Sequence, residues 1–232
     1  LREGTVVIAE RQTRGRGRLN RRWVSPAGGS WFSIILRPRV PARHLPKLTL
    51  MGSVAVAKTL RRLYGLRAVI KWPNDVLVNG RKVCGILTQA ETKSESVEFA
   101  VVGIGINANF DLSALPKSLE SSSTTLKHEL KKEIDREVLL SLLLEEVESL
   151  YRLFSEEHFD QLLTEWRSLA GMLGARVEVS VDGEKMQGQA VDIDHDGAFI
   201  LMLKGRVTRT VISGDLMVLK PTTAQQGHQH NA

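Results

Sequence analysis

The sequence is poor in cysteine and contains no long apolar run. One cysteine, Cys84, among 232 residues excludes an intramolecular disulfide framework and is typical of a protein kept in a reducing compartment. No segment reaches the roughly 18–20 apolar residues that a membrane-spanning helix requires. The first ten residues lack the pattern of a secretory signal peptide. These absences predict a cytoplasmic protein without a membrane anchor.

Two further patterns are absent. The phosphate-binding pattern GxxxxGK[ST] does not occur, which excludes a P-loop nucleotide hydrolase. No internal repeat is present either, and this excludes a repeat architecture. The chain does contain 42% hydrophobic and 25% charged residues. This composition is sufficient for a sizeable core, in one large domain or in a medium domain with a smaller one.

Positive charge is concentrated near the N-terminus. The net charge is +6, yet residues 1–47 hold eleven Lys and Arg residues against two acidic ones, so the remainder is slightly acidic. The stretch ERQTRGRGRLNRRW, residues 10–23, places six arginines around Gly15 and Gly17. Glycines let a backbone turn tightly around an anion, and guanidinium groups suit phosphate or carboxylate oxygens. The stretch is therefore either an anion-binding loop between two strands, which the flanking apolar runs favour, or an unordered arm that binds nucleic acid.

Apolar periodicity predicts two regions, one that mixes strands with long helices and one that contains short strands only. In the first, strands are expected at 5–9 (a buried strand), 31–36, 68–72, 76–78, 83–90 and 97–106, with helices over 46–64, from Asp135 to about 153, and over 159–169. Residues 111–134 are expected to form a partly irregular connection with one short helix. After Gly174, strands at 177–181, 187–193, 198–203 and 206–212 predict a small barrel or meander. The polar residues from 221 onward are expected to be disordered.

The stretch KWPNDVLVNGRKVCGIL, residues 71–87, gathers polar groups at one end of the predicted sheet. Lys71 ends a strand, Asn74 and Asp75 form a polar tip after a proline, and Lys82 follows an Asn-Gly hairpin turn. Two lysines and a carboxylate would lie together there, where cations can meet an activated carboxylate and Asp75 can hold Mg²⁺. Taken singly, these residues fit an ordinary turn and its solvated flanks equally well.

Three motifs in this order and spacing resemble the biotin–protein ligases, the biotin–[acetyl-CoA-carboxylase] ligase family. The motifs are GRGRLNRRW, then KWPNDVLVNGRKVCGIL, then GIGIN at 103–107. On its own, GIGIN fits tight strand packing about as well as a binding site. The resemblance covers nearly the whole chain, and KWPND is its most specific part.

The resemblance implies an α+β protein of two domains. Residues 1–172 would form a catalytic domain, a mixed β-sheet packed with helices in the class II synthetase-like biotin/lipoate ligase fold. Residues 173–220 would form a small SH3-like β-barrel, and residues 221–232 a disordered tail. Dimerisation through sheet edges occurs in this family and is a possible assembly here.

The reaction implied by the resemblance has two steps. The carboxylate of biotin attacks the α-phosphate of ATP, with Mg²⁺, to give biotinyl-5′-AMP and pyrophosphate. A lysine of a biotin carboxyl carrier protein then receives the biotinyl group. A mobile glycine-rich loop would order over the adenylate and exclude water from it.

The resemblance also implies a role for each matching residue. Lys82 and Arg18 would be catalytic, with Lys82 meeting the biotin carboxylate and the α-phosphate. Asp75 would bind the metal ion. Biotin would contact Gln12, Gly15, Arg16, Arg18, Lys82 and Gly85. ATP or the adenylate would contact Arg16, Arg18, Arg21, Trp23, Lys71, Asn74 and Asn107.

The sequence departs from the family pattern at three points. Asn20 stands where the family usually has glycine, although asparagine tolerates left-handed backbone angles better than most residues. The family's Ser-Thr-Asn segment, which contacts biotin, would lie upstream of Leu1, so the N-terminal part of the catalytic domain is expected to be missing. No winged helix-turn-helix precedes the catalytic motifs, so DNA binding as a repressor is not supported.

Two alternatives remain beside a biotin ligase. A lipoate-type ligase shares the fold and also loads a carrier lysine, but KWPND followed by GIL favours biotin. A basic nucleic-acid-binding module would need stacking aromatic residues on one strand face, and the C-terminal strands offer only Phe199. The module would also leave the grouping of Lys71, Asp75 and Lys82 unexplained.

Overall fold

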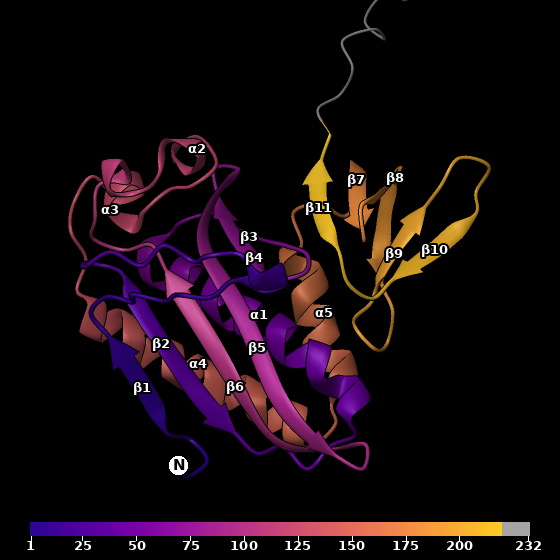
Figure 1. Ribbon diagram of the computed structural model, residues 1–232, viewed down its shortest axis with the longest axis horizontal. Coiled ribbons are helices and arrows are strands. Elements are labelled where there is room, and N and C mark those ends of the chain that lie inside the picture. The colour runs from indigo at the N-terminus through magenta and orange to yellow at the C-terminus, as the bar shows by residue number, and fades with distance from the viewer. Residues whose placement is uncertain (220–232) are drawn as a thin grey trace, which may run out of the picture.

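A computed structural model describes residues 1–219, which form two antiparallel sheets and three long helices (Figure 1). The strands and helices of the first region are β1 (Val6–Ala9), β2 (Ser30–Leu36), α1 (Leu45–Tyr64), β3 (Ala68–Lys71), β4 (Asp75–Val78), β5 (Arg81–Lys93), β6 (Ser96–Ile106), α2 (Lys117–Glu120), α3 (Leu126–Leu130), α4 (Arg136–Ser155) and α5 (Phe159–Leu169). The second region contains β7 (Arg176–Val181), β8 (Glu184–Ile193), β9 (Phe199–Met202), β10 (Thr208–Val211) and β11 (Asp215–Val218). The α+β class is confirmed.

The first sheet has six strands in the order β1-β2-β6-β5-β4-β3. Every neighbouring pair is antiparallel, so the expectation of a mixed sheet needs correction. The reason is that β3 to β6 follow one another through short turns, and such turns join antiparallel strands. Among residues 1–219, parallel pairing is confined to the isolated bridges Ile70–Ala170 and Lys82–Ser123.

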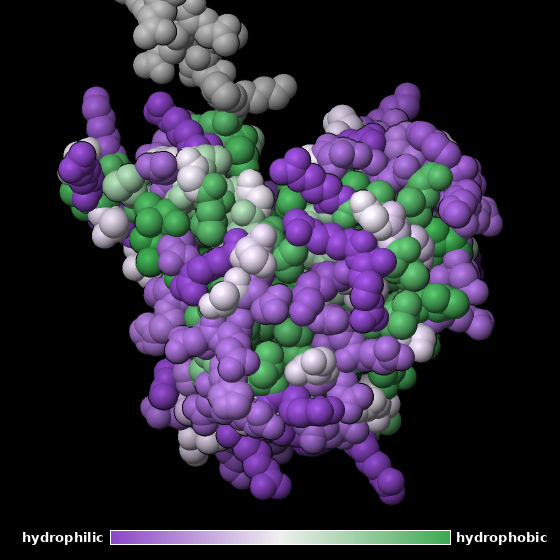
Figure 2. Space-filling view, turned by 180° about the vertical axis from the view of Figure 1, so that it is seen from behind, coloured by the Kyte–Doolittle hydropathy of each residue, from purple (hydrophilic) through white to green (hydrophobic). Residues whose placement is uncertain are grey.

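The long helices lie together on one face of the six-stranded sheet (Figure 1). Helix α1 buries most of its length against β3, β5 and β6, and it ends where Gly65 adopts a left-handed conformation, with φ of 64°. Helix α4 begins after Asp135, whose carboxylate accepts hydrogen bonds from the amides of Glu137 and Val138. Seen from behind, the outer face of the helices carries mainly hydrophilic side chains (Figure 2). The opposite face of the sheet is therefore the one left for a binding site.

Strand β1 was predicted to be buried, and this prediction is wrong. It is an edge strand paired only with β2, and the side chains of Val7 and Ile8 are 51% and 62% exposed. An apolar run of four residues does not distinguish an edge strand from a central one, because both satisfy the same pattern.

The connection between β6 and α4 contains more regular structure than predicted. It forms α2 and α3 together with a three-residue 3₁₀ turn at Leu112–Ala114, where one short helix was expected. Thr125 begins α3 by accepting a hydrogen bond from the amide of His128. Helices this short carry too little periodic pattern to be recognised from the sequence.

The C-terminal sheet has five strands in the order β10-β9-β8-β7-β11. Sequence analysis predicted four of them and missed β11, because a four-residue strand after a Ser-Gly turn carries little signal. Strands β10 and β11 are not paired with each other in the described part of the chain, so the sheet is open there. The predicted tail at 221–232 lies outside the described residues. Within residues 1–219, no helix has both the length and the apolar character needed to cross a membrane.

Candidate active site

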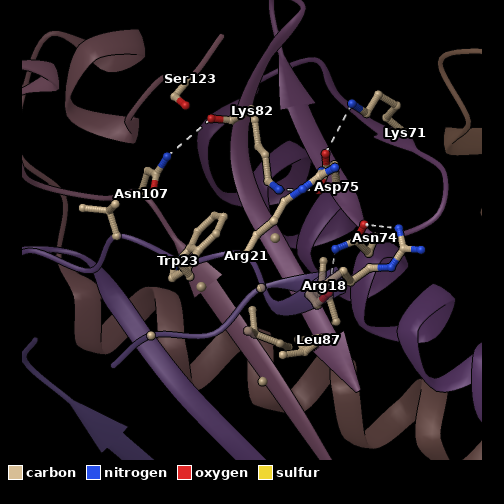
Figure 3. A pocket seen from close by; sticks show the side chains of 18 of the residues that line it. Arg18, Arg21, Trp23, Lys71, Asn74, Asp75, Lys82, Leu87, Asn107 and Ser123 are labelled. Atoms are coloured by element: carbon tan, nitrogen blue, oxygen red, sulfur yellow. Dashed lines mark hydrogen bonds and ion pairs between the residues drawn. The ribbon is translucent and has the colours of Figure 1, made fainter. Parts of the chain in front are cut away.

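A cavity of about 1010 Å³ opens on the face of the six-stranded sheet that the helices leave free. Its walls are the glycine-rich loop before β2, the strands β4, β5 and β6, the segment around Leu115–Ser123, and β11 of the C-terminal sheet. Every site residue predicted from the sequence lines it (Figure 3). These are Gln12, Gly15, Arg16, Arg18, Arg21, Trp23, Lys71, Asn74, Asp75, Lys82, Gly85 and Asn107.

The basic loop is folded, not an open arm. The amide of Trp23 donates to the carbonyl of Gly15 at 2.9 Å, and the amide of Gly17 donates to the carbonyl of Arg21 at 2.7 Å. A side chain at Gly15 would lie 2.4 Å from the Trp23 carbonyl, so only glycine fits there. Asn20 takes a φ of 57°, the left-handed conformation that asparagine tolerates. Asparagine can thus replace the family's usual glycine in this loop.

Two paired glycines form a flat floor beneath the loop. Gly85 of β5 is opposite Gly105 of β6, and the indole of Trp23 lies against both. An added Cβ at Gly105 would lie 2.7 Å from Trp23 Nε1, and one at Gly85 would lie 3.0 Å from Trp23 Cζ3. The buried Nε1 of Trp23 has no hydrogen-bond partner among residues 1–219. The floor thus admits a planar group that larger side chains would exclude.

Three charged groups converge beside this floor (Figure 3). Lys82 Nζ lies 2.5 Å from Asp75 Oδ1, at an angle that makes the contact an ion pair without a well-aligned hydrogen bond. Lys71 Nζ lies 3.4 Å from Asp75 Oδ2. Lys82 Nζ also lies 4.9 Å from the ring centroid of Trp23, within cation–π range. The predicted meeting of both lysines with Asp75 is therefore present in the structure.

Arg18 connects the loop to two other parts of the site. Its guanidinium donates to Asn74 Oδ1 at 3.5 Å, and to the carbonyl of Gly214 and the hydroxyl of Ser213 at 3.1 and 3.0 Å. Asn74 is itself held by donating its amide to the carbonyl of Ile86. Burial lowers the pKa of Arg18, although the group stays charged because an arginine pKa begins near 12.5.

Sequence analysis missed the segment that flanks Lys82. The amide of Lys82 donates to the carbonyl of Ser122 at 2.8 Å, and the amide of Thr124 donates to the carbonyl of Lys82 at 2.9 Å. Asn107 fastens the same segment by donating its side-chain amide to the carbonyl of Thr124 at 3.0 Å. The run of serines at 121–123 indicated only an irregular connection, and nothing in its composition indicated a partner strand.

The C-terminal contribution was also missed. Asp215, at the start of β11, forms an ion pair with Arg21 of the loop, and Leu216, Met217 and Val218 line the same cavity. The two regions are separated by about 190 residues of sequence. No local pattern in either one points to the other.

Asp75 is the one carboxylate among the predicted site residues, and it bears on metal binding. The described residues contain no group of three or more His, Cys, Asp or Glu side chains arranged to hold a metal ion. Mg²⁺, however, is commonly bound through one or two carboxylates, with waters and substrate phosphates supplying the remaining oxygens. Asp75 would be the protein ligand of such a shared ion, and the ion would then share the two carboxylate oxygens with the ammonium groups of Lys82 and Lys71.

Chemically, the cavity suits a ligand with two anionic parts. Lys71, Lys82, Arg16 and Arg18 surround it with positive charge, and the carboxylates of Asp75 and Asp215 partly balance this charge. The Trp23 ring, packed on the two glycines, provides an apolar surface beside the cationic groups. A carboxylate and a phosphate bound here would have their mutual repulsion screened by the same lysine.

Two family models match the chain. The model of the Biotin/lipoate A/B protein ligase family matches residues 1–107, and that of the Biotin protein ligase C terminal domain matches residues 172–217. The first match contains the loop, both lysines and Asp75, and the second contains Asp215.

Among curated proteins, the bifunctional ligase/repressor BirA of Bacillus subtilis is 37% identical over 200 residues, which cover 86% of this chain. The chain spans 62% of the length of that relative. The biotin–[acetyl-CoA-carboxylase] ligase of Paracoccus denitrificans is 32% identical over 213 residues, covering 89% of this chain and 86% of that protein.

Among solved structures, the biotin protein ligase from Aquifex aeolicus in complex with biotin and ATP superposes with a TM-score of 0.82 and 29% identity. The match covers 94% of this chain and 91% of that one. The similarity in sequence and in structure therefore extends over nearly the whole chain. The chain belongs to the biotin protein ligase family.

Proposed function

We propose that this protein activates biotin with ATP and transfers it to a lysine of a biotin carboxyl carrier protein. In the first step a carboxylate oxygen of biotin attacks the α-phosphorus, the bond to the β-phosphate breaks, and biotinyl-5′-AMP and pyrophosphate form. In the second step the amine of the acceptor lysine attacks the biotinyl carbonyl, AMP leaves, and the amine gives up a proton. The observation that carries the proposal is the convergence of Lys82 and Lys71 on Asp75 beside the glycine floor.

The arrangement of side chains supports a division of the cavity. Biotin would occupy the end lined by Gln12, Gly15 and Gly85, and the nucleotide the end lined by Asn107 and Leu115. Lys82 lies between these ends. Its ammonium would neutralise the attacking carboxylate and the α-phosphate together, and would stabilise the charge that grows during transfer.

Arg16, Arg18, Lys71 and Asn74 would bind and orient the phosphates. An ATP-dependent adenylation uses Mg²⁺ to offset the phosphate charge, and Asp75 would hold that ion. Asp75 has a second task in the proposal. Its carboxylate contacts Lys82 directly and so fixes the position of the ammonium group.

The loop at 10–23 would protect the adenylate from water. The Arg18 and Arg21 contacts with the segment Ser213–Asp215 fasten the loop over the cavity, and the Gly15 and Gly17 backbone contacts shape it. An acyl-adenylate hydrolyses when water reaches it, so a loop that closes after binding preserves the intermediate.

The proposal also covers the two domains of the chain, its acceptor protein, its compartment and its assembly. Residues 1–172 would act as the catalytic domain and residues 173–220 as an SH3-like domain that completes the nucleotide end of the cavity. The acceptor is a carrier protein with an exposed lysine, and the compartment is the cytoplasm, where ATP is available and Cys84 stays reduced. A homodimer formed through sheet edges is part of the proposal.

The deciding experiment is exchange of labelled pyrophosphate into ATP in the presence of Mg²⁺, with biotin, lipoate and octanoate as separate triggers. Exchange driven by biotin alone is the expected result. Exchange driven by lipoate or octanoate would instead identify a lipoate-type ligase on the same fold. If no acid drives exchange, in this chain or in one extended upstream of Leu1, the adenylation proposal is wrong.

A further inference from the structure

A buried lysine outside the cavity joins the two sheets. The side chain of Lys47, in the first turn of α1, has an exposed fraction of 0%. Its ammonium lies 3.3 Å from Asp196 Oδ1, and Asp196 belongs to the turn between β8 and β9. The same ammonium lies 2.7 Å from His44 Nδ1 and 4.4 Å from the ring centroid of Phe159. Lys47 therefore has partners on both sides of the boundary between the first region and the C-terminal sheet.

Burying a lysine is costly, so its retention calls for a reason. A charged ammonium loses its hydration when it is buried, and a single carboxylate repays that loss only when the geometry is good. Burial lowers the pKa of Lys47. Burial alone would raise the pKa of Asp196, but the hydrogen bond from Lys47 and the charge of Lys47, helped by the nearby histidines, together lower it. An apolar side chain would fill the same space at less cost. Unlike an apolar side chain, the lysine forms a directional contact with Asp196 across this boundary.

The turn that Lys47 holds also contacts the KWPND motif. Trp72 donates its indole N–H to the carbonyl of Gly197 at 3.3 Å, and its ring stacks on Phe199 with centroids 5.2 Å apart. Gly197 approaches α1 closely, since a Cβ there would lie 2.9 Å from Leu50 Cδ1. The turn is thus docked on both α1 and the residue that precedes the polar tip of the active site.

The C-terminal sheet reaches the active site at a second point. In the segment Ser213–Asp215, the Ser213 hydroxyl and the Gly214 carbonyl accept hydrogen bonds from Arg18. Asp215 in the same segment forms an ion pair with Arg21. Both contacts lie at the surface or are half-buried, and such contacts are individually weak. The position of this segment therefore depends on how the rest of the C-terminal sheet is anchored, and Figure 1 places that sheet directly above α1 and α5.

We propose that Lys47 is a positioning residue for the nucleotide step. Lys47 holds the turn at Asp196 against α1 and thereby fixes the position of the C-terminal sheet. The segment Ser213–Asp215 then stays close enough to the loop for Arg18 and Arg21 to contact it when the loop closes. This inference rests on the proposed function. It goes beyond it by assigning a role in catalysis to a residue that does not touch the cavity.

The test compares Lys47→Met with Lys58→Met. Lys58 is on the same helix and pairs with Glu146 and Glu165 of α4 and α5, so its loss perturbs the helical layer without touching the C-terminal sheet. Asp196→Asn is the second variant, because it removes the charge that pairs with Lys47 and keeps the size and shape of the side chain in the turn. Folding of each variant is checked by thermal unfolding, and steady-state exchange is measured over ranges of ATP and of biotin.

We expect Lys47→Met and Asp196→Asn to raise the KM for ATP by about five- to ten-fold, the lower end of a typical coupling between sites. Biotin affinity and the parameters of Lys58→Met should stay near those of the unaltered chain. Amide hydrogen exchange should also become faster at residues 213–215 and in the loop in both variants, and this readout does not depend on activity.

Combining Lys47→Met with Asp215→Asn separates positioning from a general loss of stability. If Lys47 acts through the segment Ser213–Asp215, the two effects on the KM for ATP should be less than additive. Fully additive effects, or a KM for ATP raised equally by Lys58→Met, would overturn the proposal. Absence of biotin-driven exchange in the unaltered chain would instead overturn the proposed function, and the hydrogen-exchange result would then decide the anchoring role by itself.

Discussion

Arg21 in the glycine-rich loop forms an ion pair with Asp215 at the start of β11. The pair joins the first and last parts of the described chain across the mouth of the cavity. Closure of the loop therefore depends on the position of the C-terminal sheet, because that sheet supplies Asp215. The C-terminal sheet is therefore part of the candidate active site, and its contacts with the loop can be tested separately from the chemistry.

Asp215→Asn should weaken the nucleotide step modestly. Both partners are substantially exposed, and an exposed ion pair contributes at most about 1 kcal/mol, so the KM for ATP should rise no more than about five-fold. Asp182→Asn, at the tip of the hairpin between β7 and β8, is the matched control and should leave the KM unchanged. A decrease of the KM for ATP in Asp215→Asn would contradict the role of the pair in closing the loop.

Lys82→Ala should nearly abolish adenylate formation without unfolding the chain. In the proposed function the Lys82 ammonium meets both the biotin carboxylate and the α-phosphate, and loss of such a stabilising group costs about 100-fold or more in rate. Single-turnover formation of biotinyl-5′-AMP is the measurement. Lys93→Ala, an exposed lysine at the far end of the same strand, serves as control. Near-normal turnover in Lys82→Ala would refute its assignment.

Gly105→Ala should impair the loop through Trp23. The new methyl group would lie 2.7 Å from the indole nitrogen, so the ring must move away from the floor. A displacement of this size near reacting groups lowers kcat/KM by roughly 10- to 100-fold. Gly103→Ala is the matched control, because its methyl group would meet the nearest atom, the Leu87 carbonyl oxygen, at 3.4 Å. Equal activities of the two variants would show that Trp23 does not need this position.

Acidification should destabilise the fold through His44. Burial lowers the pKa of His44 from its usual 6.5, and the neighbouring Lys47 and Arg43 act in the same direction, whereas Asp196 and Glu157 oppose them. The unfolded chain therefore takes up this proton at a higher pH than the folded chain does. The His44 contribution is complete above pH 6.5 and is lost as the pH falls from there toward the folded-state pKa.

Urea unfolding at several pH values between about 7.5 and 5 covers the range in which an ordinary histidine titrates. His44→Gln should show a shallower fall in the free energy of unfolding over this interval than the unaltered chain. His195→Gln, whose side chain is exposed, is the control. Identical pH profiles for His44→Gln and the unaltered chain would rule out His44 as the source of the dependence.

The sequence determined the elements and the chemistry that depend on local patterns. Asp135 caps α4 and Gly65 ends α1. The three motifs contain every predicted residue of the cavity except Gln12, which lies three residues before the first motif. Such features depend on a few neighbouring residues, whose backbone preferences and side-chain chemistry are readable in the chain itself. Family membership followed from the same motifs.

Only the tertiary structure decided which distant segments complete the site. The run at Ser122–Thr124 became the neighbour of Lys82, Asp215 became the partner of Arg21, and Lys47 became a buried link to Asp196. The exposed position of Val7 and Ile8 at a sheet edge was decided in the same way. Each of these contacts joins residues far apart in sequence, and no local preference encodes such a pairing. It arises when sheets and helices pack together to bury their apolar faces.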